Sequence, residues 1–492
     1  MTDKKETTIF LCLAAFIILI LLRAYKVAEA GFFDYDSVMN FLAAKGISKE
    51  DYKMLFNHVC PSFNLFYAFL YKLYPDFIFL QYVNLSLNSV AIIFFVVLFA
   101  KYFNFSKWEL VLIILLIGTS LFMVGSARYF SIDALSLLLV VLLFYCYYES
   151  IARQSKTYAY VSALLFIILF TVNYKSLLLM PILGLTEFIQ QRRRLTSKDW
   201  LFMASIAATP ILFFSVYGWI HGFSLLRYIA GITATFIRQK SEHEYVPIFS
   251  SDLFYYFKYL FFLENPLIVI VLVVFPILYR KKLFSNLREL NSYQFLFIII
   301  YCMLAGMSLL AKAPRGIAFI YPLLYLFLYL CIRKILVKKY LSYIVTSFII
   351  IYQFWLVKGA IYNYSQSSYN KVGAYLATNK ISKVALTVGV NSLPYIEKAE
   401  AKVIFDEKEL VDLKKQGYKF VVVDDFSKAA NVNKFEKLYK EPTVACYKSP
   451  SMLSPLVFLE ECEYTGLSFE QTMAVRQEAM KDTCQIRIVK LN

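Results

Sequence analysis

Two aspartates stand close together near the start of the chain, in the segment 31–41 (GFFDYDSVMNF). Asp34 and Asp36 directly follow an apolar run that is long enough to enter a membrane. Charge beside a bilayer is costly, so carboxylates there point to function. A carboxylate in this position can accept a proton from an attacking hydroxyl group, or it can hold a divalent metal ion. The structural alternative is that one of the two caps a helix over Ser37–Ala44.

Further charged residues occupy three short turns between apolar runs, SARYFSID, VNYKS and AKAPR. These turns carry Arg128, Asp133, Lys175, Lys312 and Arg315. Guanidinium and ammonium groups bind phosphate oxygens strongly. Transfer of a sugar from a lipid phosphate has two requirements. A carboxylate must activate the attacking hydroxyl group, and cations must stabilise the departing phosphate.

Each of these residues also has a structural interpretation. Arg128 can pair with Asp133 near a helix start, and Lys175 and Lys312 can reach lipid headgroups. His58 can hydrogen-bond locally. The run 238–245 (RQKSEHEY), which contains His243, can be a solvated loop.

The composition indicates the elements that must position these side chains. The chain has 492 residues, of which 60% are hydrophobic and 17% charged, so it is predicted to be a polytopic membrane protein. Its net charge of +17 comes from short basic loops such as 191–198 and 333–339, which is typical of cytoplasmic loops and argues against nucleic acid binding.

Eleven apolar ranges predict transmembrane helices. They are 9–27, 77–100, 108–124, 131–149, 157–172, 175–190, 200–220, 264–280, 293–311, 315–332 and 340–358. With a cytoplasmic amino terminus, every predicted inner loop is basic, and the carboxyl terminus lies outside. All the charged residues above then face outward, together with two long outer loops, 28–76 and 222–262. The first range could instead be a cleaved signal because of VAEAG at 27–31, but Arg23 and Lys26 disfavour cleavage.

Residues 1–360 are therefore predicted to form the membrane domain and residues 361–492 a soluble α/β domain. Strands are predicted at 384–390 and 420–423 and an amphipathic helix at 408–416. No GxGxxG or P-loop occurs, which disfavours a nucleotide site. Cys446, Cys462 and Cys484 allow one disulfide outside the cytoplasm, and their spacing does not choose the pair.

Several of these motifs resemble one family. The run 36–45 (DSVMNFLAAK), followed by His58-x-x-Pro61 and SFNLFYAFLY, resembles the first outer loop of the GT-C glycosyltransferases. The branch is the protein O-mannosyltransferase-like group, which includes bacterial lipid A aminoarabinose transferases. Asp36 matches the essential aspartate of that group, whereas Ser37 and Cys60 depart from its usual Glu and Pro. Asp133, Lys175 and Arg315 are also similar to family positions, over roughly residues 9–335.

The resemblance implies an integral membrane glycosyltransferase with about 11 transmembrane helices that uses a polyprenyl-phosphate sugar. Asp36, or failing it Asp34, would be the general base. Arg128, Lys175, Lys312 and Arg315 would bind the donor phosphate, and His58, Asp133 and His243 would position the acceptor or a metal. A divalent metal ion is the one cofactor that this site would admit.

The loop 222–262 would close over the substrates as a lid. The acceptor would be a protein hydroxyl, a lipid or an envelope glycan at the outer face of a bacterial inner membrane. Two rival hypotheses are a transporter or flippase of lipid-linked saccharides and a catalytically silent scaffold. Transporters place ionisable groups at mid-membrane and show internal repeats, which this chain lacks.

Overall fold

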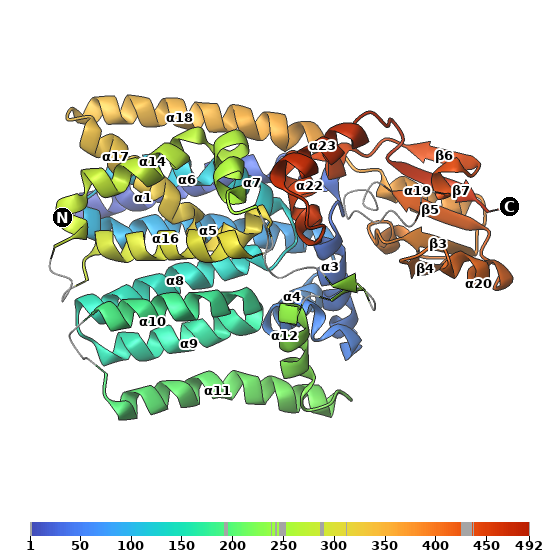
Figure 1. The fold of residues 1–492 in the computed structure, drawn as a ribbon, viewed down its shortest axis with the longest axis horizontal. Helices are drawn as coiled ribbons and strands as arrows, with labels where there is room; N and C mark the ends of the chain where they lie inside the picture. Colours follow the sequence, from blue (N-terminus) through green and yellow to red (C-terminus); the bar gives the residue numbers. More distant parts are fainter. Residues whose placement is uncertain are drawn as a thin grey trace.

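A bundle of long helices and a small sheet domain stand end to end in the computed structural model (Figure 1). The structure describes residues 2–190, 195–237, 239–241, 244–245, 252–285, 290–310, 312–424, 435 and 437–491. The amino terminus lies at the end of the bundle away from the sheet domain, and the carboxyl terminus lies at the far end of the sheet domain. The predicted site residue His243 lies outside the described residues.

All eleven apolar ranges of the sequence contain helical residues. Seven helical stretches among the described residues are long and apolar enough to cross a membrane. They contain α1 (Thr2–Ala24), α5 (Phe77–Phe103), α8 (Asp133–Ala152), α11 (Ser197–Ile220), α16 (Ser292–Leu309), α17 (Tyr321–Ile335) and α18 (Lys339–Ala360). The helices α9 (Lys156–Val172), α10 (Leu179–Ile189) and α14 (Pro266–Leu278) are shorter.

A bent pair of helices, α6 (Lys107–Gly118) and α7 (Leu121–Arg128), is long and apolar enough for a span when the two are taken together, and they meet at 63°. The buried carboxylate of Glu264 supports the bend, because it accepts a hydrogen bond from Phe122 N at 3.0 Å at the start of α7. The hydroxyl groups of Tyr259 and Tyr325 donate to the same carboxylate at 2.9 and 2.8 Å. The carboxylate therefore pairs the backbone N–H of Phe122, which the bend would otherwise leave without a partner inside the helix.

Short helices cover the end of the bundle that faces the sheet domain (Figure 1). They are α2 (Val27–Ala30), α3 (Tyr35–Ser48), α4 (Pro61–Leu73) and α12 (Arg227–Ile237). Asp34 is the N-cap of α3, since its Oδ2 accepts a hydrogen bond from Ser37 N at 2.8 Å. The expected cap is confirmed for Asp34, and the helix begins at Tyr35 and ends at Ser48, longer at both ends than predicted.

The sheet domain has five strands in the order β4-β3-β5-β7-β6. These are β3 (Lys383–Thr387), β4 (Glu400–Ile404), β5 (Phe420–Asp424), β6 (Thr443–Tyr447) and β7 (Ile486–Lys490). The first three are mutually parallel, and β7 pairs antiparallel with both β5 and β6. Helices α19 (Tyr369–Thr378) and α20 (Glu409–Lys415) belong to the same domain, and α20 ends before Gly417 at φ +91°. The predicted strands and amphipathic helix are all present.

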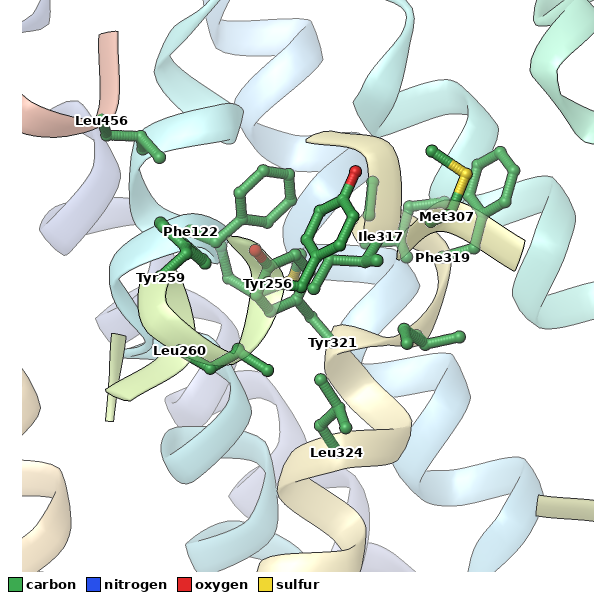
Figure 2. Packing of buried hydrophobic residues seen from close by; sticks show 14 of the residues in the cluster. Phe122, Tyr256, Tyr259, Leu260, Met307, Ile317, Phe319, Tyr321, Leu324 and Leu456 are labelled. Atoms are coloured by element: carbon green, nitrogen blue, oxygen red, sulfur yellow. The ribbon is translucent and has the colours of Figure 1, made fainter. Parts of the chain in front are cut away.

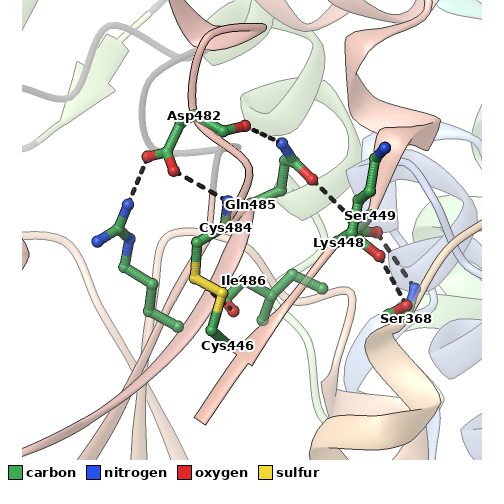
Figure 3. Close-up of a disulfide and its surroundings, with 9 residues drawn as sticks. Ser368, Cys446, Lys448, Ser449, Asp482, Cys484, Gln485 and Ile486 are labelled. Carbon is green, nitrogen blue, oxygen red and sulfur yellow. Dashed lines mark hydrogen bonds and ion pairs between the residues drawn. A yellow bond between two sulfur atoms is a disulfide. The ribbon is translucent and has the colours of Figure 1, made fainter. Parts of the chain in front are cut away.

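One disulfide joins Cys446 on β6 to Cys484, just before β7 (Figure 3). The two Cα atoms are 5.5 Å apart, within the normal range for a disulfide. Cys462, the third candidate, is buried and is not part of this disulfide. The bond closes a loop of 38 residues, and that loop contains the segment that returns to the membrane domain.

This returning segment consists of α22 (Pro455–Glu461), the short 3-10 helix Cys462–Tyr464 and α23 (Phe469–Ala479). Leu456 and Phe458 of α22 belong to the same buried cluster as Phe122 and Tyr321 of the membrane domain. Figure 2 shows Leu456 beside the aromatic core, in which Phe122 and Tyr321 stack at 4.1 Å between ring centroids. The core is therefore continuous between the two domains, and this packing places α22 against the membrane domain.

Candidate active site

Asp36 is the centre of a charged cluster at the end of the bundle where α3 lies (Figure 1). It lies in the first turn of α3, and its side chain is 27% exposed. One carboxylate oxygen contacts Arg315 Nη1, and the other lies 3.5 Å from His58 Nε2. A partly open carboxylate held between a guanidinium and an imidazole is oriented for chemistry, whereas Asp34 is turned into the backbone of its own helix.

His58 is held in an unusual backbone conformation. His58 and Val59 have φ values of 50° and 58°, a region that non-glycine residues seldom adopt and that costs about 1 kcal/mol or more per residue. The side-chain amide of Asn64 stabilises this turn by donating to Leu55 O at 3.0 Å and to Asn57 O at 3.1 Å. The turn directs the imidazole to Asp36.

Arg315 joins the two domains. It lies in a 3-10 helix, Pro314–Ile320, that leads into α17. Its backbone N donates to Glu460 Oε1 at 2.9 Å, and its Nη2 lies 2.8 Å from Glu463 Oε2. Nε lies 3.2 Å from Glu460 Oε2 and 3.1 Å from Glu463 Oε2. One guanidinium therefore contacts three carboxylates, and two of them come from the returning segment.

Lys175 completes the cluster from a third direction. It follows Asn173, whose side chain caps the 3-10 helix Tyr174–Leu178 by accepting from Lys175 N at 3.1 Å. Lys175 Nζ lies 3.6 Å from Glu463 Oε1. Asp133, in the first turn of α8, interacts electrostatically with both Lys175 and Arg315 and accepts a hydrogen bond from Ser131 Oγ at 3.0 Å.

The charges in the cluster are strongly coupled. Burial alone would raise the pKa of Asp36, but Arg315, His58 and Lys175 overcome that effect and hold the pKa below its usual range. Burial lowers the pKa of His58. The charges of Arg315 and Lys175 lower it further, whereas the charge of Asp36 raises it, and the net effect is a lowered pKa. At neutral pH, Asp36 is thus an ionised carboxylate beside a neutral imidazole.

The neighbouring carboxyl groups behave in the opposite way. Burial, reinforced by the charge of Asp36, raises the pKa of Asp34 to about 7 against the hydrogen bonds from Ser37. Burial also raises the pKa of Glu460 to about 8 and that of Glu461 well above its usual value. Asp36 is therefore the better proton acceptor of the two aspartates, because it is ionised and partly open.

Two of the predicted phosphate-binding cations bond elsewhere. Arg128 Nη1 donates to the carbonyl oxygens of Arg23, at 2.9 Å, and Tyr25, and its Nη2 donates to Ser365 Oγ at 2.9 Å. Lys312 Nζ donates to the carbonyl oxygens of Met307 and Ser308 at the end of α16, at 3.1 and 2.5 Å. Both cations bind backbone carbonyls beside a helix end, so of the four predicted phosphate-binding cations only Arg315 and Lys175 lie in the cluster around Asp36.

Sequence reasoning missed the three glutamates of the returning segment, Glu460, Glu461 and Glu463. Besides the contacts above, Glu461 accepts a hydrogen bond from Tyr35 N at 3.4 Å. The available signal was the run PLVFLEECEY, in which acidic residues directly follow an apolar stretch of a nominally soluble domain. Within the described residues, no three His, Cys, Asp or Glu side chains converge as metal ligands, so we derive no step through a metal ion.

Comparisons with known proteins identify the architecture. No family model and no curated protein sequence matches the chain. Among solved structures, the chain is similar to the crystal structure of ArnT from Cupriavidus metallidurans bound to undecaprenyl phosphate, with a TM-score of 0.54 and 11% sequence identity. The match covers 91% of this chain and 96% of that chain. The predicted GT-C type fold is thereby confirmed, including the C-terminal sheet domain.

Proposed function

We propose that the protein is an integral membrane glycosyltransferase that moves a sugar from a polyprenyl-phosphate donor to an extracytoplasmic acceptor. One observation carries the proposal: Asp36, His58, Arg315 and Lys175 come from four separate segments to one cluster at the end of the bundle where α3 lies. The fold shared with a protein solved with undecaprenyl phosphate supports the class of donor.

The arrangement suits a direct displacement. The acceptor hydroxyl oxygen attacks the anomeric carbon of the donor sugar, and Asp36 takes the proton of that hydroxyl. The bond between the anomeric carbon and the phosphate oxygen breaks, and its electron pair leaves with the polyprenyl phosphate. The phosphate gains negative charge in this step, and Arg315 and Lys175 stabilise that charge. His58 remains neutral and orients Asp36.

Two features support an outward-facing site. The Cys446–Cys484 disulfide suits an oxidising compartment for the C-terminal domain. The segment that supplies Glu460 and Glu463 belongs to that domain, so the cluster lies on the same side of the membrane as the disulfide. We place the amino terminus in the cytoplasm and the C-terminal domain in the periplasm or outside the cell.

Mass spectrometry of envelope glycoconjugates tests the proposal in cells. A deletion strain is compared with strains that carry the wild-type chain or Asp36→Asn. We expect one sugar to be lost on deletion, restored by the wild type and not restored by Asp36→Asn at equal protein level. Full restoration by Asp36→Asn would favour the rival transporter or scaffold, because neither needs a carboxylate that accepts a proton.

A further inference from the structure

The carboxylate of Glu463 bridges the two cations that the proposed function assigns to the donor phosphate. Its Oε2 lies 2.8 Å from Arg315 Nη2, and its Oε1 lies 3.6 Å from Lys175 Nζ. Two oxygens of one anionic group thus contact a guanidinium and an ammonium group. A phosphate would contact the same pair in the same way.

The charges around these cations leave no surplus for a second anion. Arg315 also contacts the ionised Asp36 and the carboxyl group of Glu460, so the charge of Asp36 and that of Glu463 already balance the two cations. Glu463 itself is only 5% exposed. A phosphate that entered this cluster beside Glu463 would meet an anion at close range, which is unfavourable in a partly buried site.

Glu463 is carried by a short turn between two helices of the returning segment. Glu463 lies beyond the last residue of α22, in the single 3-10 turn Cys462–Tyr464. Gly466 follows at φ +71°, where a glycine tolerates a conformation that other residues avoid. The helix before this turn is anchored in the core by Leu456 and Phe458. A rotation of the Glu463 side chain, or of this one turn, would release Lys175 Nζ and the Nη2 side of the Arg315 guanidinium, while Arg315 keeps its contacts with Asp36 and Glu460.

We propose that Glu463 is a donor-site residue that occupies the place of the phosphate and exchanges with it when the lipid donor binds. The inference rests on the proposed function for the assignment of Arg315 and Lys175. Through this carboxylate, the C-terminal domain sets the affinity of the site for the lipid phosphate. Glu463 is a positioning residue, since it leaves the cations before the reaction begins.

Direct binding of a radiolabelled polyprenyl phosphate to the full chain in lipid nanodiscs tests the exchange. Glu463→Gln keeps the shape of the side chain and removes its charge. We expect the Kd to fall about tenfold. One charge at this distance shifts the pKa of a neighbouring group by about one unit or more, and one pKa unit is a tenfold change in an equilibrium constant. The matched control is Glu470→Gln, which removes another ion pair between the returning segment and the membrane domain, Glu470–Lys258 at 2.8 Å. It should leave the Kd unchanged.

A second measurement uses the wild-type chain and does not depend on how the variant folds. Carbodiimide labelling of Glu463, read by mass spectrometry, should increase severalfold when polyprenyl phosphate is added. An unchanged or higher Kd for Glu463→Gln, or unchanged labelling of Glu463 while the lipid binds, would overturn the exchange and leave the proposed function intact. Absence of lipid binding by both the wild type and Glu463→Gln would overturn the exchange and the donor class together.

Discussion

Replacement of Arg315 by lysine tests whether the guanidinium geometry, and not charge alone, is needed. Lysine keeps the positive charge but loses the planar fork that contacts Asp36, Glu460 and Glu463 together. Hydrogen bonds between charged groups contribute about 1.5–3 kcal/mol each. The Arg315 side chain is 20% exposed, which puts the loss near the lower end of that range for each contact.

Loss of two of these contacts therefore costs about 3 kcal/mol. If that free energy is lost in the transition state, kcat/KM for the donor falls on the order of 100-fold, since 1.4 kcal/mol is a factor of ten. The assay is transfer from a polyprenyl-phosphate sugar in nanodiscs, with the donor concentration varied. The unfolding temperature is measured in parallel.

The matched control is Arg333→Lys at the opposite end of the bundle. Arg333 Nε lies 3.2 Å from Glu109 Oε1, and Arg333 Nη1 donates to Phe103 O at 2.9 Å. This substitution breaks a comparable arginine contact, so it should lower the unfolding temperature by a similar amount and leave transfer unchanged. Wild-type kcat/KM in Arg315→Lys, or an equal loss in Arg333→Lys, would refute the assignment of Arg315.

Two further predictions concern the charged cluster, and a third concerns the packing of α22 on the bundle. Lys175→Ala should raise the apparent KM for the donor about tenfold and leave that for the acceptor within twofold, and equal changes in both would count against a phosphate role. Because burial raises the pKa of Glu460 to about 8, its carboxyl group gains negative charge as the pH rises through that value, so donor binding should weaken between about pH 7 and 9. Glu460→Gln should flatten that dependence, and a pH profile identical to the wild type would exclude Glu460 as its source. Leu456→Ala should destabilise the docked C-terminal domain by about 2–5 kcal/mol, seen as an earlier unfolding transition, and an unchanged transition would show that Leu456 does not anchor it.

Local patterns were sufficient to predict most of the membrane domain. Apolar length and basic loops located the eleven helical ranges, because the cost of burying charge in a bilayer acts on every span separately. Asp36, Lys175 and Arg315 became candidates because each lies beside the end of a predicted span, and His58 because it lies in the loop that follows the first span.

Two aspects of the site could not be predicted from the sequence. A cation beside a helix end can serve a ligand or the backbone carbonyls of that helix, and the sequence around Arg128 and Lys312 is the same in both cases. Glu460 and Glu463 reach Arg315 from about 145 residues away, through the packing of α22 on the bundle. Contacts between residues so far apart in the sequence depend on tertiary structure, and neither hydrophobic periodicity nor motif spacing predicts them.

The most direct test of the central claim is a single-turnover measurement with purified protein. Labelled polyprenyl-phosphate sugar and an envelope acceptor fraction are mixed with the wild type, Asp36→Asn or Asp34→Asn, and the released polyprenyl phosphate is quantified. We expect release by the wild type, at least a 1,000-fold slower release by Asp36→Asn, and nearly wild-type release by Asp34→Asn once its lower stability is allowed for. Wild-type release by Asp36→Asn in a folded protein would contradict the account.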